Sequence, residues 1–131
     1  MKKLFLLFLM TLLPMIASAY DAWVDGIYYY FNQTDKIATV TYRAYDSSGN
    51  KNAYSGSVSI PSTVDYNGET YSVTSIGHHA FMYCNNLTSV DIPSSVTSIE
   101  GYVFMGCNNL IYVDIPNSVT SIGEYVFENC I

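Results

Sequence analysis

The stretch Ser75–Thr97, SIGHHAFMYCNNLTSVDIPSSVT, recurs at once and without a gap as Ser98–Thr120, SIEGYVFMGCNNLIYVDIPNSVT. A third copy, SIGEYVFENCI, begins at Ser121 and runs to Ile131. The two complete copies are identical at 15 of their 23 positions, so the period is well defined. A tandem period of about 20 to 50 residues is typical of solenoids, in which each repeat forms one coil and stacks on its neighbours. The sequence therefore predicts a solenoid.

Each complete copy carries apolar residues at the spacing L-x-x-L-x-L, in Leu87–Ile92 and again in Leu110–Ile115. This spacing is typical of the strand in a leucine-rich repeat. Val90 and Ile92 are two positions apart and share one face of the strand, so Asp91 between them points to the other face. The same alternation applies in the other coils. The full set of residues predicted to point outward is Ser57, Ser59, Ser89, Asp91, Tyr112 and Asp114.

A second apolar pattern is found between the strands. Ala80, Phe81 and Cys84 stand at positions i, i+1 and i+4, which predicts one face of a short helix. The pattern recurs at Val103, Phe104 and Cys107 and at Val126, Phe127 and Cys130. A second short extended piece is expected at Val96–Ile99. We therefore expect an α/β leucine-rich-repeat solenoid with short strands and short helices in each 23-residue repeat. Residues 73–131 carry these repeats, and the last one is incomplete.

Residues 20–72 are predicted to form a β-rich N-terminal cap with a degenerate first repeat. Gly26–Phe31 and Ile37–Tyr45 are rich in aromatic and β-branched residues, which favour strands and predict a hairpin. Gly56–Pro61 matches the repeat strand in its Ser, Val, Ile and Pro residues, so the first repeat begins there. The pair Asn67–Gly68 between strand-like flanks is a strong signal for a second, tight hairpin. Such a cap shields the apolar end of a solenoid.

Residues 1–19 have the features of a secretory signal peptide. Lys2 and Lys3 form a positive start, Leu4–Leu13 is apolar, and Ala17–Ala19 is a small-residue cleavage site. The apolar run is too short for a stable membrane span. We therefore expect cleavage after residue 19 and a mature protein that is secreted or displayed on the cell surface.

The expected mature chain is strongly acidic. It keeps 3 basic and 11 acidic residues, so its formal net charge is 3 − 11 = −8. Phosphate backbones are bound by clustered Lys and Arg, which are absent here, so we expect no nucleic-acid partner. An anionic membrane surface is a poor partner for the same reason. No other apolar run reaches spanning length, so no membrane insertion of the mature chain is expected.

Cys84, Cys107 and Cys130 occupy the same position of successive repeats. They are expected to form a stack of buried thiols that point the same way, which disfavours disulfides. No Cys-x-x-Cys or Cys/His pairing accompanies them, so a zinc site is not expected. His78 and His79 are adjacent, have no obvious third ligand and are expected at a solvated helix start. The sequence therefore predicts no metal and no cofactor.

Asp91 and Asp114 occupy equivalent outward positions on neighbouring strands. Carboxylates about 5 Å apart can serve a glycosidase or contribute to a calcium site. A glycosidase also needs a cleft, which a flat strand face does not provide, and calcium needs more oxygen ligands. Ser59 fills the same place one repeat earlier, so the ladder contains only two acids. We interpret it as an exposed acidic ladder and predict no enzymatic activity.

The pattern L-x-S-V-x-I-P-x-S-V-T-S-I-G-x-x-A-F-x-x-C resembles the BspA-like, or Treponema pallidum-type, leucine-rich repeats of bacterial surface proteins. Ser75–Thr97 is close to this consensus, whereas Ser98–Thr120 departs from it at Glu100–Gly101 and at Val103. The resemblance implies a secreted or cell-surface protein that acts in adhesion. Its implied partner is a host extracellular-matrix protein or another cell-surface protein, and no catalytic residue is carried over.

Larger members of that family bear further repeats and a C-terminal anchoring region, so the chain is expected to be the N-terminal fragment of a longer adhesin. The outward strand residues are then the predicted contact surface. The alternative is a passive spacer that carries a missing C-terminal effector or enzymatic domain. If the short chain is instead a natural product, its uncapped end near Ile131 is expected to self-associate.

Overall fold

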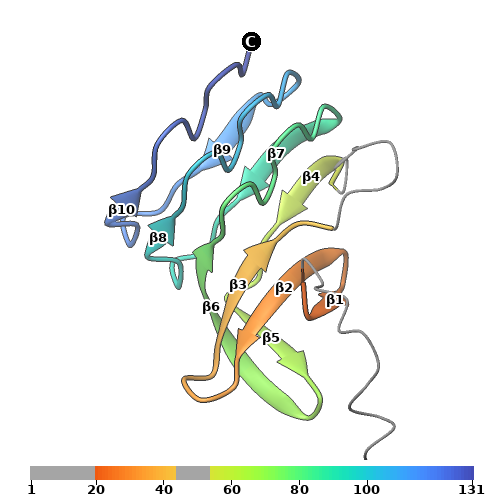
Figure 1. Ribbon diagram of the computed structural model, residues 1–131, viewed down its shortest axis with the longest axis vertical. Helices are drawn as coiled ribbons and strands as arrows, with labels where there is room; N and C mark the ends of the chain where they lie inside the picture. The colour runs from red at the N-terminus through yellow and green to blue at the C-terminus, as the bar shows by residue number, and fades with distance from the viewer. Residues whose placement is uncertain (1–19, 44–53) are drawn as a thin grey trace, which may run out of the picture.

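The computed structural model of the protein describes residues 20–43 and 54–131. This part of the chain contains ten strands and no helix (Figure 1). The strands are β1 (Ala22–Val24), β2 (Ile27–Asn32), β3 (Ile37–Thr41), β4 (Gly56–Ser59), β5 (Thr63–Tyr66), β6 (Glu69–Ile76), β7 (Leu87–Asp91), β8 (Ser98–Ile99), β9 (Tyr112–Asp114) and β10 (Ser121–Ile122). No helix able to span a membrane occurs in the described ranges. The predicted signal peptide, residues 1–19, lies outside them.

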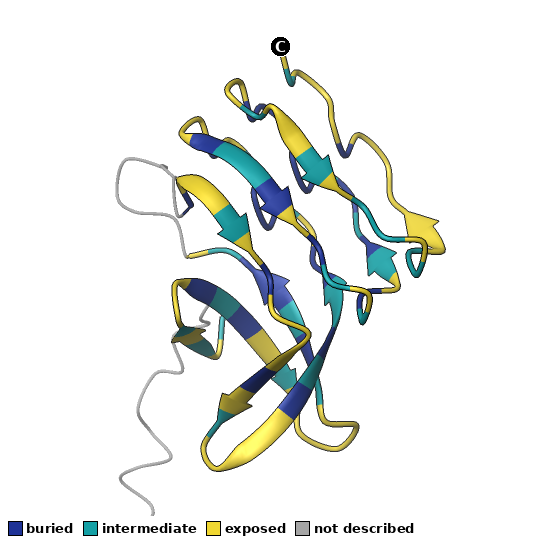
Figure 2. Ribbon diagram, turned by 180° about the vertical axis from the view of Figure 1, so that it is seen from behind, coloured by how far each residue is buried: buried dark blue, intermediate teal, exposed yellow. Residues whose placement is uncertain are grey.

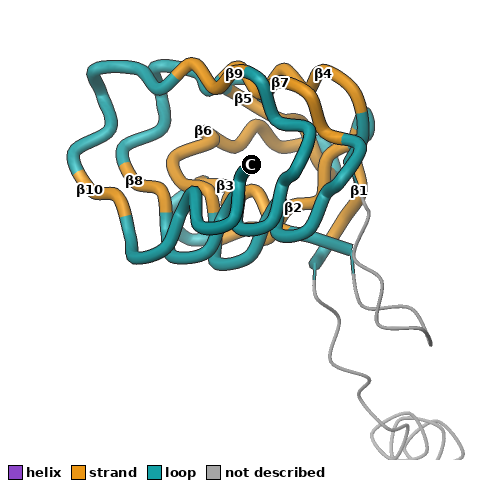
Figure 3. The backbone as a smooth tube through the Cα atoms, turned by 90° about the horizontal axis from the view of Figure 1, so that it is seen from above, coloured by secondary structure: helices purple, strands orange, loops and turns teal. Residues whose placement is uncertain are grey.

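The coils stack in the predicted register. One sheet has the order β4-β7-β9, and its strands run parallel. On the other side of the coils, β3, β6, β8 and β10 form a second parallel ladder, and Figures 1 and 3 show the two ladders flanking the coil interior. Ser89 pairs with Tyr112 and Ser98 pairs with Ser121, so each residue lies beside its equivalent one repeat later. The tandem-period prediction is confirmed.

The predicted short helices are wrong for the described residues. Ala80 lies in a run of turns that Cys84 follows, and alternate amides there donate to the carbonyl three residues earlier, as from Cys84 to Phe81 at 3.1 Å. Two residues of this run, His79 and Tyr83, have left-handed φ angles of 61° and 57°. Left-handed residues interrupt a right-handed helix. The i, i+1, i+4 spacing identified the buried side chains correctly but not their backbone.

The same two backbone positions are left-handed in all three coils from Ser75 onward. Tyr102 and Gly106 repeat the pattern in the next coil, and Tyr125 and Asn129 repeat it in the last. Glycine and asparagine adopt this conformation at low cost. The geometry turns backbone amides away from their own coil and toward the next one.

These amides form a third set of hydrogen bonds between coils. The Phe81 amide donates to the Val103 carbonyl at 3.0 Å, and the Tyr83 amide donates to the Met105 carbonyl at 2.8 Å. One repeat later, the Phe104 amide donates to the Val126 carbonyl at 2.9 Å. We call the turns at residues 78–83, 101–106 and 124–129 the turn segment. A helix would satisfy these amides within its own coil, whereas here the turn segments form a further ladder of hydrogen bonds between coils.

A stack of phenylalanine rings fills the coil interior beside this segment. Phe81 and Phe104 are fully buried, with ring centroids 5.3 Å apart and ring planes 13° apart. Phe104 also stacks on Phe127 at 5.4 Å and 9°. Burying one such side chain stabilises a fold by about 1.5–3 kcal/mol. Since each ring is covered by the ring of a neighbouring coil, this stabilisation depends on stacking.

The cysteines form the predicted stack of thiols. No disulfide joins them; Cys84 and Cys107 are buried and Cys130 is half-buried. The structure adds a hydrogen bond between coils, because the Cys107 Sγ donates to the Phe81 carbonyl at 3.0 Å. The Cys130 Sγ donates to the Phe104 carbonyl at the same distance. Burial raises the pKa of the Cys107 thiol to about 12, which keeps it protonated and able to donate.

Both predicted hairpins of the cap are present. β2 pairs antiparallel with β3, and β5 pairs antiparallel with β6 through the Asn67–Gly68 turn, whose φ angles are 50° and 76°. The structure adds a third hairpin, between β1 and β2, at Asp25–Gly26. The sequence prediction missed it, although Asp-Gly is a strong hairpin signal. β3 pairs parallel with β6, so the cap continues the sheet of the coils.

Tyr54 fixes the cap to the coil interior. Its hydroxyl accepts a hydrogen bond from the Tyr28 amide at 3.0 Å and donates to the Thr41 carbonyl at 2.6 Å. Its ring lies 4.5 Å from that of Phe81, the first ring of the phenylalanine stack. This one buried side chain therefore links strands β2 and β3, through its hydrogen bonds, to the first complete coil, through its ring contact.

Replacement of Phe104 by alanine tests the stacking. We expect Phe104→Ala to lower the free energy of unfolding by about 3–5 kcal/mol, because the ring is lost between two covering neighbours. The matched control is Phe127→Ala, since that side chain is 44% exposed, and we expect it to cost about 1–2 kcal/mol. Urea denaturation followed by circular dichroism measures both. Equal losses would contradict the stacking account.

Thiol alkylation tests the cysteine stack. At pH 8 we expect iodoacetamide to label half-buried Cys130 first, and Cys107 only after urea unfolds the chain, because burial shields the Cys107 thiol and raises its pKa. Peptide mass spectrometry after timed quenching gives the rate at each position. Labelling of Cys107 in the folded protein as fast as that of Cys130 would show that the stack is open.

Candidate functional site

Three parallel strands carry two rows of outward side chains. We call this surface the strand face. Its residues are Ser57, Ser59, Ser89, Asp91, Tyr112 and Asp114. All are exposed except Ser89, which is half-buried, whereas the valines between the two rows belong to the buried core or pack against it. Figure 2 shows this change between exposed and more buried residues along the three strands. The predicted outward alternation is therefore confirmed, and the structure brings all six residues together on one sheet.

The first row runs from Ser57 through Ser89 to Tyr112. The Ser89 hydroxyl donates to the Ser57 hydroxyl oxygen at 2.8 Å, so these two side chains orient each other across β4 and β7. Tyr112 continues the row on β9 and is 53% exposed. An exposed tyrosine offers both flat apolar area and a hydroxyl, which is typical of contact surfaces.

The second row runs from Ser59 through Asp91 to Asp114. Neighbouring strands are about 4.8 Å apart, so the two carboxylates project side by side from one edge of the sheet. The backbone fixes this edge, because the Ile60 amide donates to the Asp91 carbonyl at 3.0 Å and the Ile92 amide donates to the Asp114 carbonyl at 3.3 Å. In the described part of the chain, neither carboxylate forms an ion pair.

The histidine pair lies on the turn segment and not at a helix start. His78 contacts Glu100 of the next coil, with Nε2 and Oε2 3.4 Å apart, and its backbone amide donates to the same carboxylate at 3.0 Å. The His79 ring lies 5.3 Å from that of Tyr102. Within residues 20–43 and 54–131, no group of three or more His, Cys, Asp or Glu residues is placed to hold a metal ion.

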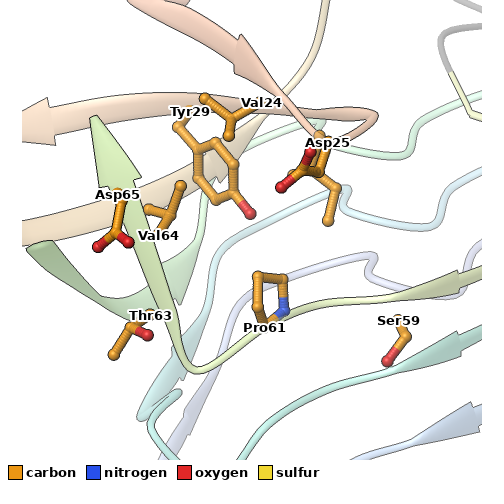
Figure 4. A pocket seen from close by; sticks show the side chains of 9 residues that line it. Val24, Asp25, Tyr29, Ser59, Pro61, Thr63, Val64 and Asp65 are labelled. Atoms are coloured by element: carbon orange, nitrogen blue, oxygen red, sulfur yellow. The ribbon is translucent and has the colours of Figure 1, made fainter. Parts of the chain in front are cut away.

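A hollow of about 350 Å³ lies where the cap meets the strand face (Figure 4). The β1–β2 hairpin contributes Asp25 and Tyr29, and β5 contributes Asp65. Ser59, the first residue of the acidic row, also lines it. The hollow is therefore continuous with the predicted contact surface. We call it the cap hollow.

A second hollow, of about 370 Å³, shares Asp25, Ile27 and Ser59 with the cap hollow. Trp23 and Tyr28 line it together with Ser57 and Ser59 of the strand face. Trp23 is 62% exposed, with its ring 6.3 Å from that of Tyr28. Trp23 was not predicted as a surface residue, and in the sequence only the Asp25–Gly26 turn signal indicates its position beside a hairpin turn.

Negative charge gathers at the cap hollow. Burial, followed by the nearby Asp25 carboxylate, raises the pKa of Tyr29 to about 12. Asp65 accepts a hydrogen bond from the Thr70 hydroxyl at 2.6 Å. No ion pair to Asp25 or Asp65 is found in the described ranges, and Lys36 is paired with Glu69. The site therefore combines exposed carboxylates, hydroxyls and aromatic rings.

Known proteins share this architecture of stacked repeats. The family model described as BspA type Leucine rich repeat region (6 copies) matches residues 27–131. Among solved structures, the chain is similar to a leucine-rich repeat protein from Bacteroides ovatus, with 33% identity, a TM-score of 0.73 and coverage of 85% of this chain and 27% of that one. It is also similar to a leucine rich cell surface protein from Faecalibacterium prausnitzii, with 28% identity, a TM-score of 0.65 and coverage of 89% and 29%.

A third similar structure is a leucine-rich repeat protein from Treponema pallidum, with 23% identity, a TM-score of 0.65 and coverage of 84% and 46%; at this identity the likeness shows the fold alone. The chain spans less than half the length of each of these three proteins. Comparison with curated proteins finds no match. Because the family model covers more than half of the chain and the fold agrees, the protein belongs to the BspA-type leucine-rich repeat family.

Proposed function

We propose that the protein is a secreted or surface-displayed bacterial adhesion module that binds another protein through the strand face. The observation that carries this proposal is the pair of exposed rows across β4, β7 and β9. Solenoids present such extended surfaces to their partners. One similar protein is described as a cell surface protein, which supports the location.

The partner we propose is an extracellular-matrix protein or a protein on another cell, and its contact surface is basic. Asp91 and Asp114 are exposed without ion-pair partners in the described part of the chain, so cationic side chains can approach them from solvent. Complementary charge across an interface favours the correct partner and accelerates association. Tyr112 at the end of the serine row supplies apolar contact area.

Binding suits this face better than catalysis. The two carboxylates stand on an open sheet, where water reaches both. A glycosidase needs a cleft that holds the sugar between its two carboxyl groups, and the open strand face does not form one. A contact surface needs only the exposed charges and ring that this face presents.

The triple variant Asp91→Asn, Tyr112→Ala, Asp114→Asn tests the proposal. We expect at least a tenfold loss of affinity, because about 1.4 kcal/mol corresponds to a factor of ten and each variant side chain loses a charge or a ring contact. Surface plasmon resonance against immobilised collagens, laminin and fibronectin measures capture. Raising the salt concentration should weaken wild-type capture, since exposed charges are screened.

The matched control is Glu124→Gln with Glu128→Gln, which removes the same charge from the turn segment. We expect this control to retain wild-type affinity. Equal affinity of the triple variant and the wild type would rule out the strand face as the binding surface. Failure of the wild-type protein to capture any protein of the panel would instead favour the passive-spacer role.

A further inference from the structure

The cap hollow has apolar walls and a polar interior. Val24, Ile27 and Val64 provide aliphatic surface, and Asp25 and Asp65 bring carboxylates from different hairpins. Figure 4 shows these two carboxylates on opposite sides of the Tyr29 ring. A hollow of about 350 Å³ with this lining has room for a long aliphatic side chain that ends in a charged group.

Tyr29 presents a polar group to the hollow, and this also indicates a ligand. The residue is only 1% exposed, and its hydroxyl points into the hollow on the side of Asp25 (Figure 4). This hydroxyl forms no hydrogen bond with the described residues. The oxygen faces the hollow and is open to water, since among the described residues only Ser95 Oγ is a fully buried side-chain oxygen or nitrogen without a partner. An oxygen acceptor aimed into a hollow of this size therefore suits a donor supplied from outside.

The charges of the hollow define the chemistry of that donor. Asp25 and Asp65 form no ion pair in the described ranges, and Asp25 lies close enough to contribute to the raised pKa of Tyr29. A cation that donates hydrogen bonds satisfies both the carboxylates and the hydroxyl. Lysine and arginine side chains combine such a head with an aliphatic stem that packs on apolar walls.

We propose that the cap hollow is an anchor pocket for a basic side chain of the protein partner. This proposal rests on the proposed function, since it assigns the hollow to the partner that lies along the strand face. Ser59 links the two surfaces: it lines the hollow and begins the row that continues through Asp91 and Asp114. A segment crossing the strands places one basic side chain in the hollow and further ones along the acidic row, about one strand spacing apart.

Titration of the purified protein with a blocked pentapeptide, Gly-Gly-Lys-Gly-Gly, tests the pocket. Amide chemical shifts in nitrogen-15 NMR spectra report where the peptide binds. We expect saturable shifts at Asp25, Tyr29 and Asp65 at peptide concentrations up to about 10 mM, the range of a single-side-chain contact. The same peptide with acetyl-lysine keeps the stem but loses the charge, and we expect it to bind at least tenfold more weakly. An arginine peptide distinguishes the two basic heads.

The variants separate the pocket from general charge attraction. Asp25→Asn with Asp65→Asn should weaken lysine-peptide binding at least tenfold, and Tyr29→Phe should weaken it about threefold. Asparagine tolerates the φ of 48° at Asp25 and keeps an oxygen to accept from Thr70 at position 65, so these variants preserve the fold. The matched control, Glu124→Gln with Glu128→Gln, removes the same charge from exposed positions outside the hollow and the strand face, and should change the affinity by less than about twofold.

Four outcomes of the titration overturn the proposal. These are equal binding of the acetyl-lysine peptide, equal weakening by the control variant, absence of saturable shifts at the hollow, and shifts there only with a neutral oligosaccharide, which would assign a glycan instead. Partner capture separates this proposal from the proposed function. If the strand-face triple variant loses capture while Asp25→Asn with Asp65→Asn keeps it, the strand face binds and the pocket is wrong. If the matrix panel is not captured at all, the peptide titration still decides whether the hollow binds a basic side chain.

Discussion

Hydrogen bonding between coils is the constraint on which the rest of this structure depends. No coil has enough apolar surface to form a core of its own, so the phenylalanine and cysteine side chains are buried only against their neighbours. The turn segment strengthens this dependence. Its left-handed residues direct amides such as those of Phe81 and Tyr83 to the carbonyls of the next coil, where a helix would have kept them within its own coil.

This constraint also creates the surface that we propose to be functional. Because every residue lies beside its equivalent one repeat later, a choice of residue at one repeat position becomes a row across the sheet. Ser59, Asp91 and Asp114 form such a row. The cap then adds what a regular solenoid lacks, since its first hairpin and β5 enclose a hollow at the start of the row. Regular stacking supplies an extended surface, and the irregular end supplies a recessed site.

Much of this architecture is predictable from the sequence. The 23-residue period, the outward residues of the strands, the buried thiols and the Asn67–Gly68 hairpin all follow from spacing and turn chemistry. The helix prediction failed because the apolar spacing at Ala80, Phe81 and Cys84 fits both a helical face and a chain of turns, and only left-handed backbone angles separate them. The cap hollow was not predictable, because Asp25 and Asp65 stand forty residues apart in the sequence and line one hollow only in the folded cap.

The most direct test of the coil-stacking account is the NMR scalar coupling that passes through a backbone hydrogen bond. A long-range correlation experiment identifies the carbonyl that accepts from each amide. We expect the Phe81 nitrogen to couple to the Val103 carbonyl carbon, and the Tyr83 nitrogen to couple to that of Met105. Coupling of Phe81 to Gly77 and of Tyr83 to His79, four residues earlier in each case, would show a helix within the coil and would contradict the account.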